Sequence, residues 1–193
     1  MLWQTDGMAA APTPLSLDEF HRLYDDKKPY YEYWFGEVRQ KPMPKFLHGA
    51  MQFIIMFLLH ARGWNAFPEI RLKLHPEAEP VPDVIALRKG ETVENPYPTK
   101  PFGLCVEIVS PGDSLKKLFK KAEYYVSWGV SYVWIIDPQM RTAWMIAAEA
   151  KDPIWIHPDG ALRADDTELP LQELFAELDK KMSGVLLADE DFT

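Results

Sequence analysis

The sequence contains only one cysteine in 193 residues, so no disulfide can form within the chain. This scarcity fits the reducing conditions of a cytoplasm, which is the expected location. The sequence also lacks any apolar run of the roughly 20 residues that a membrane-spanning helix requires. Its first sixteen residues have neither the basic start nor the apolar stretch of a secretion signal. We therefore expect a cytoplasmic protein with no membrane partner.

Positive charge is also scarce, because 21 lysines and arginines stand against 29 acidic residues and leave a net charge of −8. This excess of acid argues against a protein that wraps nucleic acid without sequence preference, although it leaves room for a local basic patch. Hydrophobic residues make up 47% of the chain and aromatic residues 13%, which is typical of a globular protein. The length suits one domain of ordinary size.

Hydrophobic periodicity predicts helices and strands that alternate along the chain, which indicates the α/β (α+β) class. Helices are expected over 15–28, 48–63, 113–129 and 169–182. Strands are expected over 67–76, 81–87, 104–110, 130–138 and 142–148, the last two joined by a turn. Hairpins are expected over 30–42, with a turn at Phe35-Gly36, and over 153–166, with Asp159-Gly160 at the tip.

No internal repeat or long linker divides the sequence, so we expect a single domain over 1–193. Its parts are listed in chain order: a helix and hairpin extension over 1–45, a core over 46–150, and a C-terminal hairpin and helix over 151–193. The run over 48–63 is apolar nearly all round and predicts a buried helix. The run over 67–76 alternates between apolar and charged residues, with Arg71 among the charged ones, and predicts a half-buried strand with a polar outer face.

Two carboxylates stand in apolar runs that otherwise predict buried strands. Glu107 lies within LCVEIVSPGD, and Asp83 lies near the start of VPDVIAL. Because an unpaired buried carboxylate is very unfavourable, each is expected to be paired, protonated or bound to a metal. Consecutive strands are often neighbours, and an antiparallel pairing can set residue 83 opposite residue 107 on one face of the sheet. A Mg²⁺ or Mn²⁺ ion between them would remove their repulsion, since these cations prefer oxygen ligands.

The helix expected after Glu107 carries four lysines, at positions 116, 117, 120 and 121. Residues four apart lie on one helix face, so Lys117 and Lys121 form one row, and we expect Lys121 to point toward the sheet. Each feature also has a plainer interpretation. Asp83 can cap a turn, Glu107 can face solvent or a salt bridge, and the lysines can form a solvated helix face. Only the order of the three features favours a catalytic site.

Four motifs occur in an order that resembles a known family. VPDV matches a Pro-Asp element, VEIVSP matches a Glu-x-x-Ser-Pro strand, and KKAEYYVSWGVSYVWIIDP matches a pattern of lysine, tyrosine, Gly-Val, aromatic strand and Asp-Pro. Upstream, YEYWFGEVRQKP is followed by His48 and a long apolar helix. Over most of its length the chain resembles the Uma-type family of restriction-endonuclease-like proteins, a branch of the PD-(D/E)XK nuclease superfamily. The resemblance implies a restriction-endonuclease-like core, with a mixed central sheet flanked by helices and an N-terminal hairpin extension.

The resemblance implies that Asp83 and Glu107 hold the metal and that Lys121 orients the attacking water or binds the phosphate. The superfamily signature has a lysine two residues after the glutamate, where this chain has Val109. A lysine displaced to the following helix is therefore implied, and the choice among its lysines at 117, 120 and 121 stays open.

Further site residues are implied by the same resemblance. Glu37 and Glu69 resemble acids that accompany the core pair in the family. His48 is either a substrate contact or a structural residue at the start of its helix. Lys117 is the accessory candidate among the helix lysines.

The implied chemistry is metal-dependent hydrolysis of DNA by an endonuclease, with Mg²⁺ or Mn²⁺ as cofactor and a homodimer as the acting form. The alternative is a catalytically inactive, nuclease-derived scaffold that binds a protein or nucleic-acid partner, which the acidic balance favours. A serine or cysteine hydrolase is disfavoured, because no Gly-x-Ser-x-Gly motif is present and Cys105 is expected in the core. The aromatic residues of the first hairpin, Tyr31, Tyr33 and Trp34 among them, are expected to be exposed and either to cover the sheet or to form a subunit contact.

Overall fold

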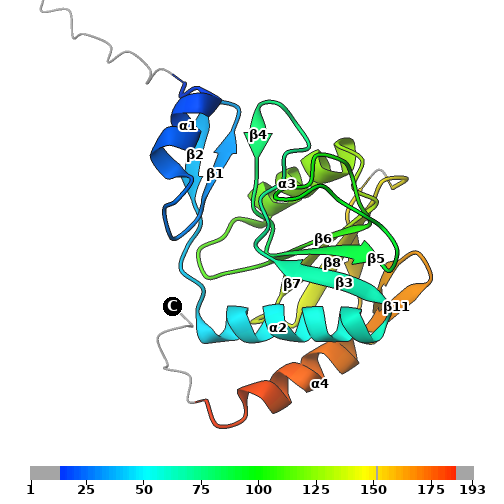
Figure 1. The fold of residues 1–193 in the computed structure, drawn as a ribbon. Coiled ribbons are helices and arrows are strands. Elements are labelled where there is room, and N and C mark those ends of the chain that lie inside the picture. The colour runs from blue at the N-terminus through cyan, green and yellow to red at the C-terminus, as the bar shows by residue number, and fades with distance from the viewer. Residues whose placement is uncertain (1–13, 151, 186–193) are drawn as a thin grey trace, which may run out of the picture.

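The computed structural model describes residues 14–150 and 152–185 (Figure 1). Its helices are α1 (Leu17–Tyr24), α2 (Phe46–Ala61), α3 (Leu115–Ser127) and α4 (Leu171–Met182). Its strands are β1 (Tyr31–Trp34), β2 (Glu37–Gln40), β3 (Trp64–Pro68), β4 (Ala78–Glu79), β5 (Val84–Arg88), β6 (Leu104–Ile108), β7 (Tyr132–Asp137), β8 (Thr142–Ala147), β9 (Ile154–Ile156), β10 (Ala161–Ala164) and β11 (Thr167–Pro170). No helix within these described ranges is long and apolar enough to cross a membrane.

The core is a six-stranded mixed sheet in the order β3-β5-β6-β7-β8-β9. In this sheet β6 and β7 run parallel and are connected through α3, whereas the other neighbours are antiparallel. Figure 1 shows α3 on one side of the sheet and α2 on the other, with α4 beside α2. The predicted α/β class, with a mixed central sheet flanked by helices, is confirmed.

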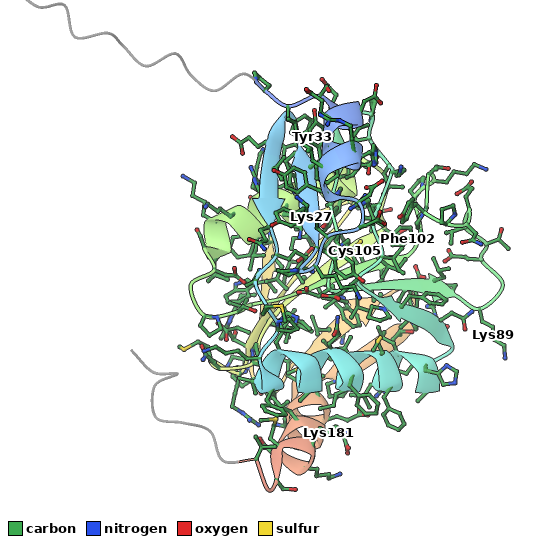
Figure 2. The ribbon with its side chains drawn as sticks, turned by 60° about the vertical axis from the view of Figure 1, so that its left-hand side comes forward. Lys27, Tyr33, Lys89, Phe102, Cys105 and Lys181 are labelled. Carbon is green, nitrogen blue, oxygen red and sulfur yellow. The ribbon has the colours of Figure 1, made fainter. Side chains whose placement is uncertain are left out.

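The two central strands β5 and β6 are covered on both faces, as their continuous apolar runs predicted. The even-numbered residues of both strands pack toward α2 and α4, whereas the odd-numbered residues pack toward α3. Cys105 is therefore a fully buried core residue, as expected. Figure 2 shows it inside the molecule, while Lys89 and Lys181 project from the surface. The same parity assigns Asp83 and Glu107 to the α3 side of the sheet.

The N-terminal extension combines α1 with a three-stranded sheet in the order β2-β1-β4. The hairpin turns at the predicted Phe35-Gly36 pair, where φ is 50° and 89°, and such left-handed pairs are typical of tight hairpins. Trp34 is only 2% exposed and stacks on Trp128 at the end of α3, with 5.8 Å between ring centroids. Tyr33 is buried as well. The expectation of exposed hairpin aromatics was wrong for these two residues. Trp34 covers the α3 side of the core, whereas Tyr33 packs against Phe20 of α1.

The strand expected over 67–76 was misplaced. β3 covers Trp64–Pro68 and ends where Glu69 takes a left-handed φ of 51°, which turns the chain out of the sheet. Arg71, expected on a polar outer face, is only 6% exposed and lies 3.8 Å from the carboxylate of buried Glu79. The charged position in this alternating pattern is therefore a residue, Arg71, that is paired inside the molecule. It does not mark the solvent-exposed face of a strand.

The C-terminal hairpin was also misplaced. β9 pairs with β8 at the edge of the central sheet, and the hairpin is formed by β10 and β11. Its turn lies at Asp165-Asp166, where Asp165 has a left-handed φ of 51°, and not at Asp159-Gly160. Strand β9 pairs there with β8, and this position buries Ile156 in the core. The final helix, α4, forms as predicted and packs against α2.

Helix α2 has two apolar faces with different surroundings. Its inner face packs against the central sheet through Met51, Ile55 and Leu59, among others. On its outer face Phe53 and Phe57 are about half exposed, at 49% and 56%. The prediction of a helix here was confirmed, and its expected burial holds for the inner face but not for Phe53 and Phe57.

Candidate active site

Asp83 and Glu107 lie opposite each other near the centre of the sheet. Strands β5 and β6 pair antiparallel in a register that sets Val84 beside Val106. One further step in this register brings residue 83 opposite residue 107, on the same face of the sheet. Both side chains are buried, with 3% of each residue exposed. The predicted pairing of these two strands is confirmed, and its register is the one that brings the two acids together.

Glu107 is held by two side chains of α3. The hydroxyl of Tyr125 donates to its Oε1 atom across 2.8 Å, and the Nζ atom of Lys121 lies 2.9 Å from the same oxygen. Residues 121 and 125 are one helical turn apart, which places both over the same strand. Burial raises the pKa of Glu107 to about 7; Lys121 opposes this rise, and the charge of Asp83 adds to it.

Asp83 has a different set of partners. Its Oδ2 atom accepts a hydrogen bond of 2.7 Å from the backbone N–H of Ile108. Its Oδ1 atom accepts one of 2.7 Å from the Nζ atom of Lys41, and His48 Nε2 lies 3.5 Å from the same oxygen. Burial disfavours the charged carboxylate, but Lys41 and His48 outweigh it and hold the pKa of Asp83 well below its usual range. Asp83 is therefore ionised at neutral pH.

Acidic and basic side chains alternate across the site. The Nζ atom of Lys121 lies 2.8 Å from Oε1 of Glu32, a buried residue of β1. Glu32 is itself fixed, because it accepts hydrogen bonds from the backbone N–H of Val81 and the indole N–H of Trp34. Burial alone would lower the pKa of Lys121, but Glu107 and Glu32 outweigh it and raise that pKa. Lys121 is thus a charged bridge between two acids.

The charged residues of the site line one cavity of about 300 Å³: Glu32, Lys41, Asp83, Glu107 and Lys121. The cavity also contains Glu69, His48 and Lys117, three of the accessory residues that the sequence indicated. His48 Nδ1 lies 3.0 Å from the hydroxyl of Ser110, so this histidine connects α2 to the loop after β6. The walls come from the N-terminal extension, α2, the two central strands and α3. Residues that are far apart in the sequence therefore meet in one place.

Two of the residues considered from the sequence lie elsewhere. Glu37 is exposed and pairs with Arg39 across 2.8 Å; it is not part of the cavity wall. Lys120 is also exposed and pairs with Glu123 across 3.1 Å. Of the lysines on α3, it is Lys121 that reaches Glu107.

Sequence reasoning missed two charged residues of the site. Glu32 had a detectable signal, because a carboxylate within the aromatic run YEYW is the same kind of anomaly that singled out Glu107. Lys41 had none, since it follows β2 among other polar residues and only the fold brings it to Asp83. Tyr125 belongs to the lysine and tyrosine motif that the sequence contains, but its hydrogen bond to Glu107 was not predicted.

The oxygen donors of the site suit a hard divalent cation. Asp83 and Glu107 line the cavity from opposite strands, and Mg²⁺ is commonly held by one or two carboxylates while it keeps several waters. Within the part of the chain that the structure describes, no three histidine, cysteine or acidic side chains are grouped to hold a metal ion. The residues therefore fit Mg²⁺ or Mn²⁺ with water ligands better than a cation enclosed by protein ligands alone.

A mixed sheet with a buried acid pair at its centre and a helix lysine beside it defines an α/β protein with a nuclease-like fold. A family model described as "Uma2: Putative restriction endonuclease" matches residues 17–179, and the chain belongs to this family. A solved structure from Anabaena variabilis, described as "a putative nuclease belonging to DUF820", is 26% identical and superposes with a TM-score of 0.71. The match covers 86% of this chain and 99% of that chain. The comparison with curated proteins finds no match.

Proposed function

We propose that this protein is an endonuclease that hydrolyses DNA phosphodiester bonds with the help of Mg²⁺ or Mn²⁺. The observation that carries the proposal is the position of Asp83 opposite Glu107 in the wall of one cavity, with Lys121 against Glu107. Membership of the family and the nuclease-like fold support the same class of reaction. Divalent metals are the typical cofactors of restriction-endonuclease-like proteins.

Each residue of the site has a distinct role in this proposal. Asp83 and Glu107 would hold the cation, which when bound polarises the scissile phosphate and lowers the pKa of a bound water. Lys121 stays charged and stabilises the negative charge that develops on the phosphoryl oxygens. Tyr125 fixes Glu107 and Glu32 fixes Lys121, each through a hydrogen bond of 2.8 Å.

Carboxamide substitutions of the two acids test the proposal. Asp83→Asn and Glu107→Gln each remove one negative charge while they keep the size of the side chain. We expect each to lower kcat/KM for metal-dependent DNA cleavage by about a hundredfold or more, because several kcal/mol of metal-assisted stabilisation is lost. Glu123→Gln is the matched control, since it removes an exposed carboxylate of α3 that lies outside the cavity.

The assay uses supercoiled, linear and single-stranded DNA, so that cleavage of any of these forms is detected. Circular dichroism shows whether each variant is folded. Cleavage by Asp83→Asn and Glu107→Gln at the rate of the Glu123→Gln control would remove the assignment.

A catalytically inactive scaffold that binds a partner is the second candidate. Two observations favour it: lysines pair with both carboxylates, and the net charge of −8 opposes binding to phosphate-rich surfaces. Calorimetry separates the two candidates. The endonuclease binds Mn²⁺ in a manner that requires Asp83 and Glu107, whereas a scaffold releases no heat that depends on these two residues.

A further inference from the structure

The lysine that pairs with Asp83 comes from outside the central core. Lys41 follows β2 in the N-terminal extension, and its side chain reaches the start of β5. Its Nζ atom donates to Oδ1 of Asp83 across 2.7 Å and to the carbonyl of Val81 across 2.9 Å. The side chain is 13% exposed and lines the cavity. The ammonium group of Lys41 thus forms an ion pair with a carboxylate that the proposed function assigns to the metal.

The charges around the cavity indicate what Lys41 does beyond pairing with Asp83. Three buried carboxylates, those of Asp83, Glu107 and Glu32, meet two ammonium groups, those of Lys41 and Lys121. When all are ionised the group carries one negative charge. Binding of a divalent cation changes the net charge of these side chains to one positive charge. Binding of a phosphodiester, which carries one negative charge, then brings the net charge to zero. A cluster without net charge is the least unfavourable one to bury. The complex with metal and substrate reaches zero net charge when both ammonium groups are present, so both lysines are needed in it.

We propose that Lys41 occupies the metal-binding side of Asp83 until a divalent cation binds, and that its ammonium group then binds the scissile phosphate. This inference rests on the proposed function and adds a second lysine to it. The ammonium group and the cation compete for one carboxylate oxygen, because two positive charges at such short range repel each other. The displaced ammonium stays in the same small cavity, where a phosphate oxygen is its natural partner.

A lysine with this role affects metal and DNA in opposite directions. Without the charge of residue 41, the cation meets no competitor and binds more tightly, while the phosphodiester loses a partner and binds more weakly. A lysine that only stabilises the folded position of Asp83 predicts a different result. Its loss would loosen a metal ligand and weaken the binding of the cation as well.

Substitutions at residue 41 measure both effects on the full chain. We expect Lys41→Gln, which keeps a hydrogen-bond donor, to bind Mn²⁺ about tenfold more tightly in calorimetry. In DNA cleavage the same variant should raise KM about tenfold with a smaller change in kcat, the sign of lost ground-state binding. Lys41→Arg should keep the wild-type KM but bind Mn²⁺ a few-fold more weakly, because arginine forms a forked pair with a carboxylate. Lys120→Gln removes the same charge outside the cavity and should change neither value.

The outcomes separate this inference from the proposed function. If the wild type binds Mn²⁺ but Lys41→Gln binds it no more tightly than Lys120→Gln does, Lys41 is only a structural partner of Asp83 and the inference is wrong. If neither the wild type nor any variant binds Mn²⁺, the proposed function fails and the inference with it. If Lys41→Gln does not fold in a urea titration, Lys41→Arg decides, and an unchanged Mn²⁺ affinity of that variant overturns the inference.

Discussion

Asp83 and Glu107 face each other across two strands, yet their partners drive their pKa values apart. The pKa of Asp83 is lowered, because Lys41, His48 and the charge of Lys121 outweigh its burial. The pKa of Glu107 is raised to about 7 by burial, which Lys121 only partly offsets. When the pKa values of two neighbouring carboxyl groups differ in this way, one of them holds a proton over a pH range in which the other is ionised. Below neutral pH Glu107 carries that proton, and the proposed function requires that Glu107 lose it before a cation binds.

The raised pKa of Glu107 predicts how the stability of the metal-free protein depends on pH. Between the ordinary value of 4.5 and the folded value of about 7, the folded chain binds more protons at this site than the unfolded chain does. The free energy of unfolding therefore falls as pH rises through this window, by an amount on the order of a few kcal/mol. Urea titrations with EDTA at about pH 5 and about pH 7.5 measure this loss. Glu107→Gln cannot ionise at residue 107 and should lose much less stability over the same interval.

The comparison with Glu107→Gln isolates the contribution of residue 107 from every other contribution to the pH dependence of stability. Asp83 does not disturb the result, since its lowered pKa acts below the ordinary value of 3.8. Glu123→Gln, with an exposed carboxylate removed, should follow the wild type. Equal losses in the wild type and in Glu107→Gln would show that Glu107 ionises freely in the folded protein.

At the scale of elements, the sequence predicted well where one physical signal dominates. The continuous apolar runs of β5 and β6 and the amphipathic stripe of α3 lie where the pattern placed them. The prediction failed for β3 and for the C-terminal hairpin, because pairing partners and left-handed residues such as Glu69 and Asp165 decided those elements. Such choices depend on distant strands and leave no local periodicity.

The same distinction holds for the candidate site. Asp83, Glu107 and Lys121 were found because carboxylates in apolar runs and a lysine row on a helix are visible locally. Lys41 was not found, because its contact with Asp83 exists only once the N-terminal extension folds onto the core. A charged residue in a polar segment leaves no signal of such a long-range pairing, whereas Glu32 stands out because its own segment is aromatic.

The outer face of helix α2 carries an outer stripe formed by Phe46, Gly49, Phe53 and Phe57. This stripe predicts that copies of the chain associate with one another. The rings of Phe53 and Phe57 stack with 6.4 Å between centroids, and a side-chain atom added at Gly49 would meet nothing within 4 Å. A row of aromatic residues around a small one offers a surface that a second copy can match by two-fold symmetry. We therefore expect a homodimer through this stripe, with a mass by light scattering of twice the 22.3 kDa chain.

Lysine substitutions test the outer stripe. Phe57→Lys places a charge at its centre and should convert the dimer to a monomer, because an unpaired charge at an interface is unfavourable. Phe67→Lys is the matched control, since Phe67 is 42% exposed but belongs to β3. A monomeric wild type contradicts the homodimer, and a dimer that survives Phe57→Lys places the interface elsewhere.

At the scale of the whole molecule, the distribution of charge limits how the proposed endonuclease can contact DNA. The net charge is −8, and the lysines and arginines that line the cavity are Arg39, Lys41, Lys117 and Lys121. Three of these four already pair with acids of the chain. An acidic body with a few cations at one cavity suits contact with a short stretch of backbone, and it gives little affinity for an extended duplex surface.

This distribution predicts a shallow dependence of DNA cleavage on salt. Each phosphate neutralised by a lysine or arginine adds about −0.9 to the slope of log affinity against log salt concentration on duplex DNA. Because four lysines and arginines of the described part of the chain line the cavity, kcat/KM should fall with a slope no steeper than about −4 between about 50 and 200 mM NaCl. A slope near −8 would reveal a wider basic contact than one cavity provides. Lys117→Gln removes a cation of the cavity that is not assigned to metal binding or catalysis. This variant should make the slope shallower by about one. Lys120→Gln, on the same helix but outside the cavity, should leave the slope unchanged.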